Sequence, residues 1–204
     1  MDLLNIFNAA NKLEKASNSK EFLKKRYVKN RNTELRKNQK IDNVLQKVLS
    51  NFNIHTSLSY FEEMGCPIPL SNIRIDNINR RVIEIIIEMP SENRFKSAYV
   101  YYCAFFHELA HSVRATYMNI DDIKKSLYKS GRMIEEVIAE TTTIVLANEF
   151  GIATKKRLEY NLDYIKAWML HYKEYEDFEF SEEMFNSEIV PEVKKRLKII
   201  LDNA

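Results

Sequence analysis

The chain has 204 residues, of which 45% are hydrophobic and 29% charged, as is ordinary for a soluble globular protein with one substantial core. Only three glycines and four prolines are present, which favours helices over β-hairpins. No apolar run reaches the roughly 18 residues of a membrane-spanning helix, and the start, MDLLNIFNAANKLEK, lacks the features of a secretory signal. Cys66 and Cys103 lie among apolar residues without zinc-site spacing, which favours buried thiols. We therefore expect a cytoplasmic protein without membrane contact.

The net charge of +2 conceals an uneven distribution along the chain. Residues 1–60 hold twelve Lys and Arg against five Asp and Glu, a balance of +7, whereas residues 61–204 have a balance of −5. A basic segment ahead of an acidic body is compatible with non-specific contact to nucleic acid. The alternative is a helical segment that packs on the body or extends its core, with its lysines in solvent. The pattern thus predicts two parts, a basic helical segment (1–60) and a body (61–204).

Hydrophobic periodicity predicts a mostly helical chain with one clear strand. The β-branched residues of 82–88, followed by Pro90, predict this strand. A helix is expected to begin at Ser91 and to contain the segment YYCAFFHELAHSVRA, and a polar connector follows it. Gly151 lies where a helix C-terminus favours a positive φ. The predicted helices are 3–16, 19–31, 41–53, 91 to about 117, about 133–150, about 156–175 and about 191–202.

The sequence HELAH places His107 and His111 four residues apart on a predicted helix. They then project from one face about 5–6 Å apart, a span across which two imidazoles can share one metal ion. Glu108 is rotated by about 100° from His107, so it can serve as general base toward the hydrolytic water without ligating the metal. The alternative is a pair of core histidines that bond backbone carbonyls. Burying them beside a carboxylate without a metal would cost several kcal/mol unless every group were paired.

A catalytic zinc also needs a third protein ligand and an open position for water. The predicted helix 133–150 carries Glu136 and Glu140 on one face, and the rest of its surface is mostly apolar, which is typical of a buried helix. One carboxylate can ligate the metal while the other holds a histidine N–H. The alternative is a surface stripe in which Glu135, Glu136 and Glu140 lie in water. The spacing alone does not decide which glutamate binds.

Several motifs in one order resemble the zincin-like metallopeptidase domain of ArdC-type antirestriction proteins. They are a strand ending in Met89-Pro90, then Phe95, the HELAH helix, the EEVIAE segment at 135–140, and Tyr164-Ile165 with Trp168. The resemblance covers about residues 80–200, and its ordered set is more specific than HExxH alone. It implies an α+β, mostly helical zincin-like metallopeptidase fold with a small β-sheet and an active-site HExxH helix. It also implies one Zn²⁺ per chain, a protein or peptide substrate, and a gene on a plasmid, phage or other mobile element.

The resemblance also assigns roles to individual residues. In zincins with a glutamate ligand, a small residue and then an acid follow the ligand; Ala139 and Glu140 match these, so Glu136 is the implied third ligand and Glu140 its support. The strand 82–88 is implied to pair with an extended peptide beside the cleft, as edge strands do. Residues 1–60, however, do not match the single-stranded-DNA-binding domain of that family. Alternative functions are therefore a metal-bearing protein that binds DNA or protein with little peptidase turnover, and a helical interaction protein without metal.

Overall fold

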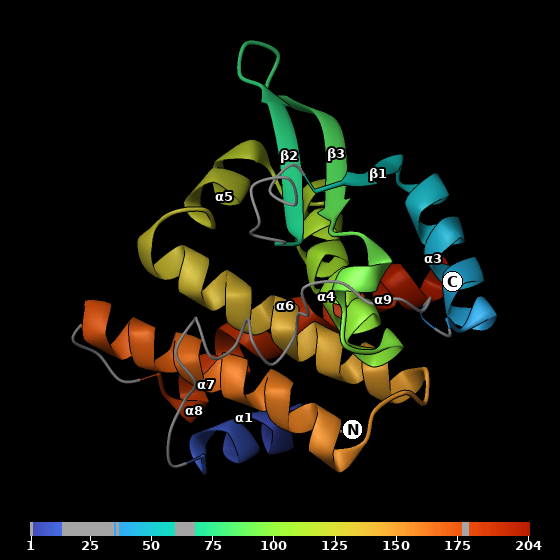
Figure 1. Ribbon diagram of the computed structural model, residues 1–204. Helices are drawn as coiled ribbons and strands as arrows, with labels where there is room; N and C mark the ends of the chain where they lie inside the picture. Colours follow the sequence, from blue (N-terminus) through green and yellow to red (C-terminus); the bar gives the residue numbers. More distant parts are fainter. Residues whose placement is uncertain (1, 14–34, 36, 60–67, 177–179) are drawn as a thin grey trace.

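The computed structural model describes residues 2–13, 35, 37–59, 68–176 and 180–204. The architecture is α+β and mostly helical, with one three-stranded sheet (Figure 1). Short 3-10 turns cover Glu92–Arg94 and Arg114–Thr116, and a π-helical turn, Phe185–Ile189, leads into the last helix. The main elements are α1 Leu3–Asn11, α3 Gln39–Asn51, β1 Ile54–Leu58, β2 Leu70–Asp76, β3 Arg81–Met89, α4 Ala98–Val113, α5 Ile120–Lys125, α6 Lys129–Glu149, α7 Lys155–Glu176, α8 Glu182–Met184 and α9 Val190–Asp202.

The sheet has the strand order β1-β3-β2, with β1 parallel and β2 antiparallel to β3. The predicted strand 82–88 is confirmed as β3, but the expectation that it pairs with a substrate peptide as an edge strand is wrong, because both of its sides are paired. Its apolar run fits this central position, since Ile85, Ile87 and Met89 are buried. The flanking strands were not predicted because their sequences, IHTSL and LSNIRID, have little apolar alternation.

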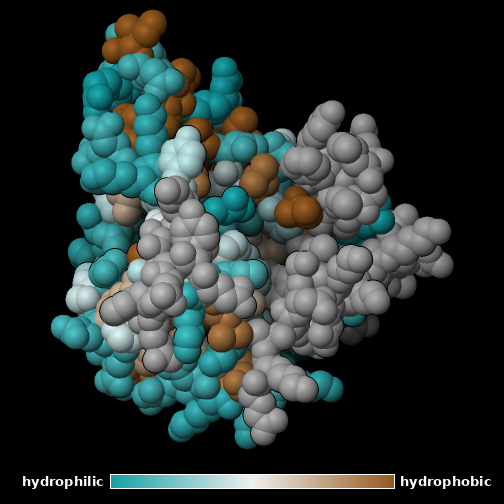
Figure 2. Space-filling view, turned by 90° about the vertical axis from the view of Figure 1, so that its left-hand side faces the viewer, coloured by the Kyte–Doolittle hydropathy of each residue, from teal (hydrophilic) through white to brown (hydrophobic). Residues whose placement is uncertain are grey.

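The β2–β3 hairpin projects from the body of the molecule (Figure 1). Its turn is closed by Asp76, whose Oδ1 accepts the N–H groups of Ile78 and Asn79, both at 3.0 Å. Arg80 completes the turn with a φ of 49°. Ile78 at the tip is 93% exposed, and Figure 2 shows a hydrophobic group at the height of this tip.

Helix α4 passes between the sheet and α6, so nearly all of its residues are buried, polar ones included. It begins at Ala98 rather than at Ser91 as predicted. Ser97 is the N-cap, and its hydroxyl accepts the N–H of Val100 at 3.4 Å. Between the two serines, Phe95 is fully buried in an extended conformation, which excludes a continuous helix. The position of α4 holds its histidines inside the protein.

The connector after Tyr117 is not wholly irregular, because it contains α5, whose Ile120 and Ile123 are buried. Helix α6 begins earlier than predicted, at Lys129, and its first turn contains Gly131. A Cβ atom at Gly131 would clash with the carbonyl oxygen of Lys125, so only glycine allows this approach. At the other end of α6, Gly151 has a φ of 66°, as expected. The N–H groups of Gly151 and Ile152 donate to the carbonyls of the last turn.

Two hydrophobic clusters form the core. The first joins α3, the sheet, α4 and the C-terminal end of α6, and the second joins α1, α6, α7 and the segment from Phe180 to Val193. The described parts of residues 1–60 contribute to both, for example through Phe7 in the second and Leu45 in the first. The division at residue 60 stays a prediction.

Two expectations concern residues outside the described ranges, namely the helix 19–31 and Cys66. Cys103 is buried, as expected. None of the described helices has the length and apolar character that crossing a membrane requires.

Candidate metal centre

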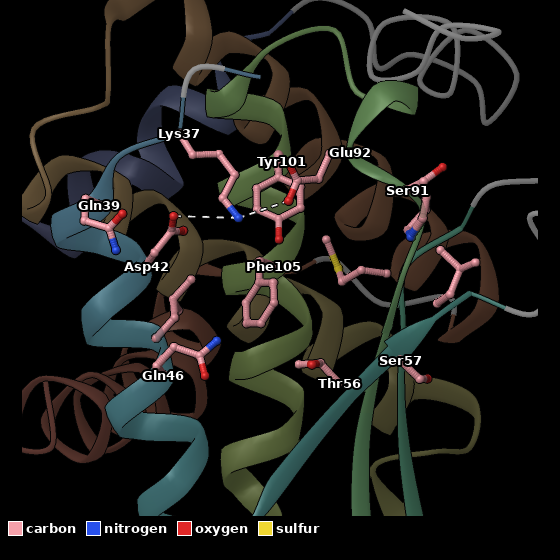
Figure 3. A pocket seen from close by; sticks show the side chains of 14 residues that line it. Lys37, Gln39, Asp42, Gln46, Thr56, Ser57, Ser91, Glu92, Tyr101 and Phe105 are labelled. Atoms are coloured by element: carbon pink, nitrogen blue, oxygen red, sulfur yellow. Dashed lines mark hydrogen bonds and ion pairs between the residues drawn. The ribbon is translucent and has the colours of Figure 1, made fainter. Parts of the chain in front are cut away.

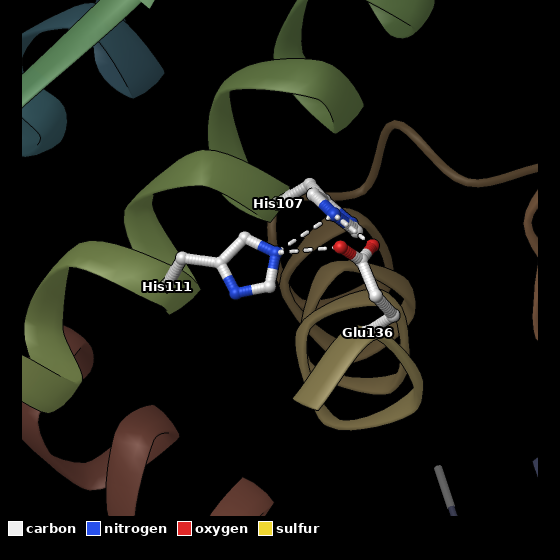
Figure 4. Close-up of side chains that lie close together, drawn as sticks. All are labelled: His107, His111 and Glu136. Carbon is white, nitrogen blue, oxygen red and sulfur yellow. Dashed lines mark hydrogen bonds and ion pairs between the residues drawn. The ribbon is translucent and has the colours of Figure 1, made fainter. Parts of the chain in front are cut away.

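His107 and His111 of α4 converge with Glu136 of α6 (Figure 4). The two Nε2 atoms are 3.1 Å apart, and the Nε2 atoms of His107 and His111 lie 3.2 and 3.9 Å from oxygens of Glu136. Two ligand atoms at about 2.0–2.1 Å from a tetrahedral zinc ion are about 3.3 Å apart. The three side chains therefore present donor atoms at separations that one zinc ion can bridge.

The second ring nitrogen of each histidine is held by a carboxylate of α6. His107 Nδ1 donates to Glu140 at 2.7 Å, and His111 Nδ1 donates to Glu135 at 2.8 Å. Because an ionised carboxylate only accepts hydrogen bonds, each Nδ1 carries a proton and each Nε2 can offer its lone pair to a metal. The alternative in which backbone carbonyls satisfy both histidines is wrong, because carboxylates accept their Nδ1 hydrogen bonds. The alternative of a surface stripe of glutamates in water is also wrong, because Glu135 and Glu140 are buried.

The charges at the centre favour a cation among the three donors. Burial lowers the pKa of His107, but hydrogen bonds to Glu136 and Glu140 outweigh it and raise this pKa to about 10. Burial raises the pKa of Glu136, but its hydrogen bond to His107 and the two histidines together lower this pKa to about 2. A positive charge between the rings and Glu136 is thus stabilised, and a proton or a divalent cation can supply it. The donor set, two imidazoles and one carboxylate, fits zinc.

Uncharged side chains from α4 and α7 support the His107 side of the centre. Glu140, which is fully buried, accepts a hydrogen bond from Asn161 Nδ2 of α7. The amide oxygen of Asn161 in turn accepts the hydroxyl of Tyr99 at 2.7 Å. These three residues, which we call the α7 network, fix Glu140 and through it the ring of His107.

Two buried arginines support the His111 side. The Nη1 and Nη2 atoms of Arg196, on α9, donate to Glu135, at 2.6 and 2.7 Å. Arg114 lies 3.1 Å from the same carboxylate. Burial raises the pKa of Glu135, but Arg196, His111 and Arg114 hold it far below its usual value. We call Glu135, Arg196 and Arg114 the α9 network.

Glu108 lies beside the three donors and lines the same cleft. It is 8% exposed, and burial raises the pKa of its carboxyl, while the two histidines counteract this rise. The backbone N–H of Ser71, on β2, donates to the carboxylate. The sheet therefore fixes the candidate general base relative to the histidines.

The cleft over the centre has a volume of about 370 Å³. Its walls come from the start of β2, from the connector before α6, and from α7. Tyr164 of α7 donates its hydroxyl to Glu136 at 2.8 Å, and Trp168 packs edge-on against Tyr164. Both aromatic residues line the cleft, and Trp168 also packs against the second hydrophobic cluster.

A larger pocket of about 610 Å³ lies at the β1 edge of the sheet, between α3 and α4 (Figure 3). Lys37 projects into it and pairs with Glu92 at 3.0 Å and Asp42 at 3.6 Å. Its lining includes neither histidine nor cysteine, and Lys37 is already neutralised. We therefore place the chemistry in the smaller cleft.

The structure brings together all five residues singled out from the sequence, namely His107, Glu108, His111, Glu136 and Glu140. Sequence reasoning missed the supporting residues Arg196, Asn161 and Tyr99, and it treated Glu135 only as part of a surface stripe. The motif EEVIAE drew attention to Glu135, but its partner Arg196 lies 61 residues away. Only the folded chain reveals that pair.

Comparison with known proteins agrees with this geometry. Residues 81–181, about half of the chain, match the family model of a zincin-like metallopeptidase. Searches of the curated proteins and of the solved structures gave no match. The matched segment contains β3 as well as α4 and α6, the two helices that carry the candidate base and donors, and it ends before α9. With this match, its α+β architecture and its HExxH helix, the chain has the zincin-like metallopeptidase fold.

Proposed function

We propose that the protein is a zinc-dependent metallopeptidase in which His107, His111 and Glu136 hold one Zn²⁺ per chain. The observation that carries the proposal is the orientation of the two histidines. Both Nε2 atoms face Glu136, and both Nδ1 atoms are held by buried carboxylates. A histidine pair that served packing alone would not need two ionised carboxylates beneath it, because burying them is costly.

A bound Zn²⁺ would supply a water of near-neutral pKa and would polarise the substrate carbonyl. Glu108 would take the proton of this water and pass it to the departing amine. A carboxyl whose pKa burial has raised is better matched to such transfers near neutral pH than an ordinary glutamate. The N–H of Ser71 orients this carboxylate.

We expect the hydroxyl of Tyr164 to stabilise the negative charge that develops on the oxygen of the attacked peptide carbonyl. Tyr164 lines the cleft and reaches the candidate ligand Glu136. The same cleft is bordered by Leu70 and Ser71 of β2, which is an edge strand among the described strands. An extended peptide could pair with β2 there, so a protein or peptide is the substrate that the geometry favours.

Metal analysis and peptide cleavage by the wild type and two variants test the proposal. We expect about one zinc ion per chain in wild type, in Glu108→Gln and in the control Glu149→Gln, whose residue is exposed near the end of α6. Cleavage should be lost in Glu108→Gln alone. Absence of zinc uptake by the wild type would contradict the metal site, and undiminished cleavage by Glu108→Gln would contradict the mechanism.

The ordered motifs from Met89-Pro90 to Trp168 support an ArdC-like type and an origin in a mobile element. A zinc-loaded protein without cleavage would favour the alternative, an antirestriction-type protein that binds DNA or protein.

The excess of +7 in residues 1–60 supports nucleic-acid contact as a further proposal. Replacing Lys24 and Lys25 by Glu should then weaken a DNA mobility shift that also falls steeply between about 50 and 200 mM salt. Deleting residues 1–40 is a poorer test, because α1 buries Phe7 in the core.

A further inference from the structure

We propose that α9 belongs to the metal centre and that Arg196 positions His111 through Glu135. This inference rests on the proposed zinc site and extends it beyond the segment that matches the family, residues 81–181. Arg196 is fully buried although it is charged, and it is the largest side chain in the fully buried set. Arginines are seldom buried to this extent unless they are paired.

The geometry of the pair leaves Glu135 one orientation. The two ends of the guanidinium fork meet the two carboxylate oxygens, Nη1 with Oε1 at 2.6 Å and Nη2 with Oε2 at 2.7 Å. Such a two-point contact fixes the plane of the carboxylate as well as its position. His111 Nδ1 donates to the same Oε1 that Arg196 Nη1 contacts. Rotation of Glu135 would therefore break its contact with Arg196 and the hydrogen bond that orients His111.

Arg196 also holds the two ligand-bearing helices together. Its Nη1 donates to the carbonyl oxygen of Ala110 on α4 at 3.2 Å, and its partner Glu135 lies on α6. Ala110 directly precedes His111, and Glu135 directly precedes Glu136. Arg196 thus contacts the residue directly before each of two proposed zinc ligands, one on each helix. A lysine has one compact charge and could not make the two-point contact with Glu135.

Stability alone is a weak reason for this arrangement. A buried ion pair is often no more stabilising than apolar side chains of similar volume, because both charges must leave water. Apolar residues would fit the surroundings, since Val193 and Ile200 of the same helix are buried. An apolar pair would, however, leave His111 Nδ1 without a carboxylate. The need to orient the His111 ring therefore explains why Glu135 and Arg196, rather than two apolar residues, are buried here.

The coupling should act in both directions. If docking of α9 favours the orientation of His111 that binds zinc, then zinc must favour the docked state of α9 by the same free energy. Zinc should therefore slow amide hydrogen exchange in α9, although no proposed ligand lies on that helix. With a purely structural Arg196, zinc would slow exchange in α9 no more than in helices that zinc stabilises only through global unfolding.

Zinc affinity of the full chain, measured by competition with a chromophoric chelator, provides the first test. We expect Arg196→Met and Glu135→Gln each to weaken zinc binding by about 10- to 100-fold. The double variant should lose little more than either single variant, because both act through His111. Lys198→Met is the matched control, since Lys198 lies on the same helix with its side chain 76% exposed, and it should bind zinc like the wild type. Zinc affinity within about twofold of wild type in Arg196→Met, or additive losses in the double variant, would overturn the proposal.

Hydrogen exchange of α9, with and without zinc, provides the second test and remains informative if Arg196→Met does not fold. Arg196→Lys keeps the charge and should fold, with zinc affinity between those of wild type and Glu135→Gln. Zinc should slow α9 exchange in the wild type and much less in Glu135→Gln. An exchange rate in α9 that zinc does not change in the wild type would overturn the coupling. A wild-type protein that binds no zinc would instead refute the proposed function, before any variant is compared.

Discussion

On the two sides of the candidate metal centre, different chemistry holds the two histidines in the same way. On one side the α7 network holds His107 through Glu140, Asn161 and Tyr99, and its outer members are uncharged. On the other side the α9 network holds His111 through Glu135, which contacts two buried guanidinium groups. Loss of an uncharged outer member leaves an unmet hydrogen bond, whereas loss of Arg196 leaves a buried carboxylate with only part of its compensating charge. The α9 side should therefore be the more sensitive to substitution.

The largest effects should come from the donors that both sides serve. Glu136→Ala and His111→Ala should abolish tight zinc binding, because each leaves two protein donors. Glu140→Ala removes only the support of His107 and should weaken binding by about 10- to 100-fold. Metal content after dialysis and chelator competition measure both effects. If Glu140→Ala were the more damaging of the two glutamate substitutions, the assignment of the third ligand would be reversed.

Unfolding of the metal-free protein should separate the two networks. Arg196→Met leaves Glu135 ionised and buried, so we expect a loss of about 3 kcal/mol in the free energy of unfolding. Asn161→Ala removes one hydrogen bond to Glu140 and should cost about 1–2 kcal/mol. Denaturant titrations with a common slope provide the comparison. Equal losses would show that the charge of the α9 network is irrelevant to its sensitivity.

A pH dependence should arise from the α7 side. The pKa of His107 is raised from the ordinary 6.5 to about 10 in the metal-free fold. The stabilisation from this shift is complete below pH 6.5 and is lost as the pH rises towards 10. The metal-free protein should thus lose stability over that range, and Glu140→Gln should flatten the loss. Zinc binding at pH 7 should release about one proton, detectable by calorimetry in buffers of different ionisation enthalpy.

The smallest effect should come from the outermost member of the α7 network. Tyr99→Phe keeps the ring and removes only the hydroxyl that donates to Asn161. We expect a stability loss of about 1 kcal/mol and a zinc affinity close to that of wild type. A tenfold loss of zinc affinity would mean that the α7 network controls the orientation of His107 as strictly as the α9 network controls that of His111.

The sequence predicted those parts of the molecule that depend on local pattern. Periodicity located α3, α4, α6, α7 and α9 to within a few residues at most ends. HELAH and EEVIAE contain the three candidate donors that the structure brings together. The start of α4 was misplaced because Ser91 and Ser97 are both plausible caps, and burial of Phe95 decides between them. The burial of Phe95 depends on the sheet, which local pattern does not reveal.

Features that depend on distant partners were not predicted. Strands β1 and β2 have polar sequences, and their pairing with β3 gives them their structure. Because β3 is central, the edge strand beside the cleft is β2 among the described strands. Arg196 likewise resembles any other basic residue in the sequence KKRLK, and its burial follows from a contact across 61 residues.

The place of Arg196 in the chain has a consequence for biosynthesis. Protein synthesis proceeds from the N-terminus, and residues 107 to 136 leave the ribosome well before residue 196. A nascent chain that ends within α7 carries all three candidate donors and the candidate base, but the guanidinium that aligns Glu135 is still missing. Such a chain should capture zinc poorly and cleave little. If the chain is a zinc peptidase, as proposed, its full activity would thus be delayed until α9 has been synthesised and has docked.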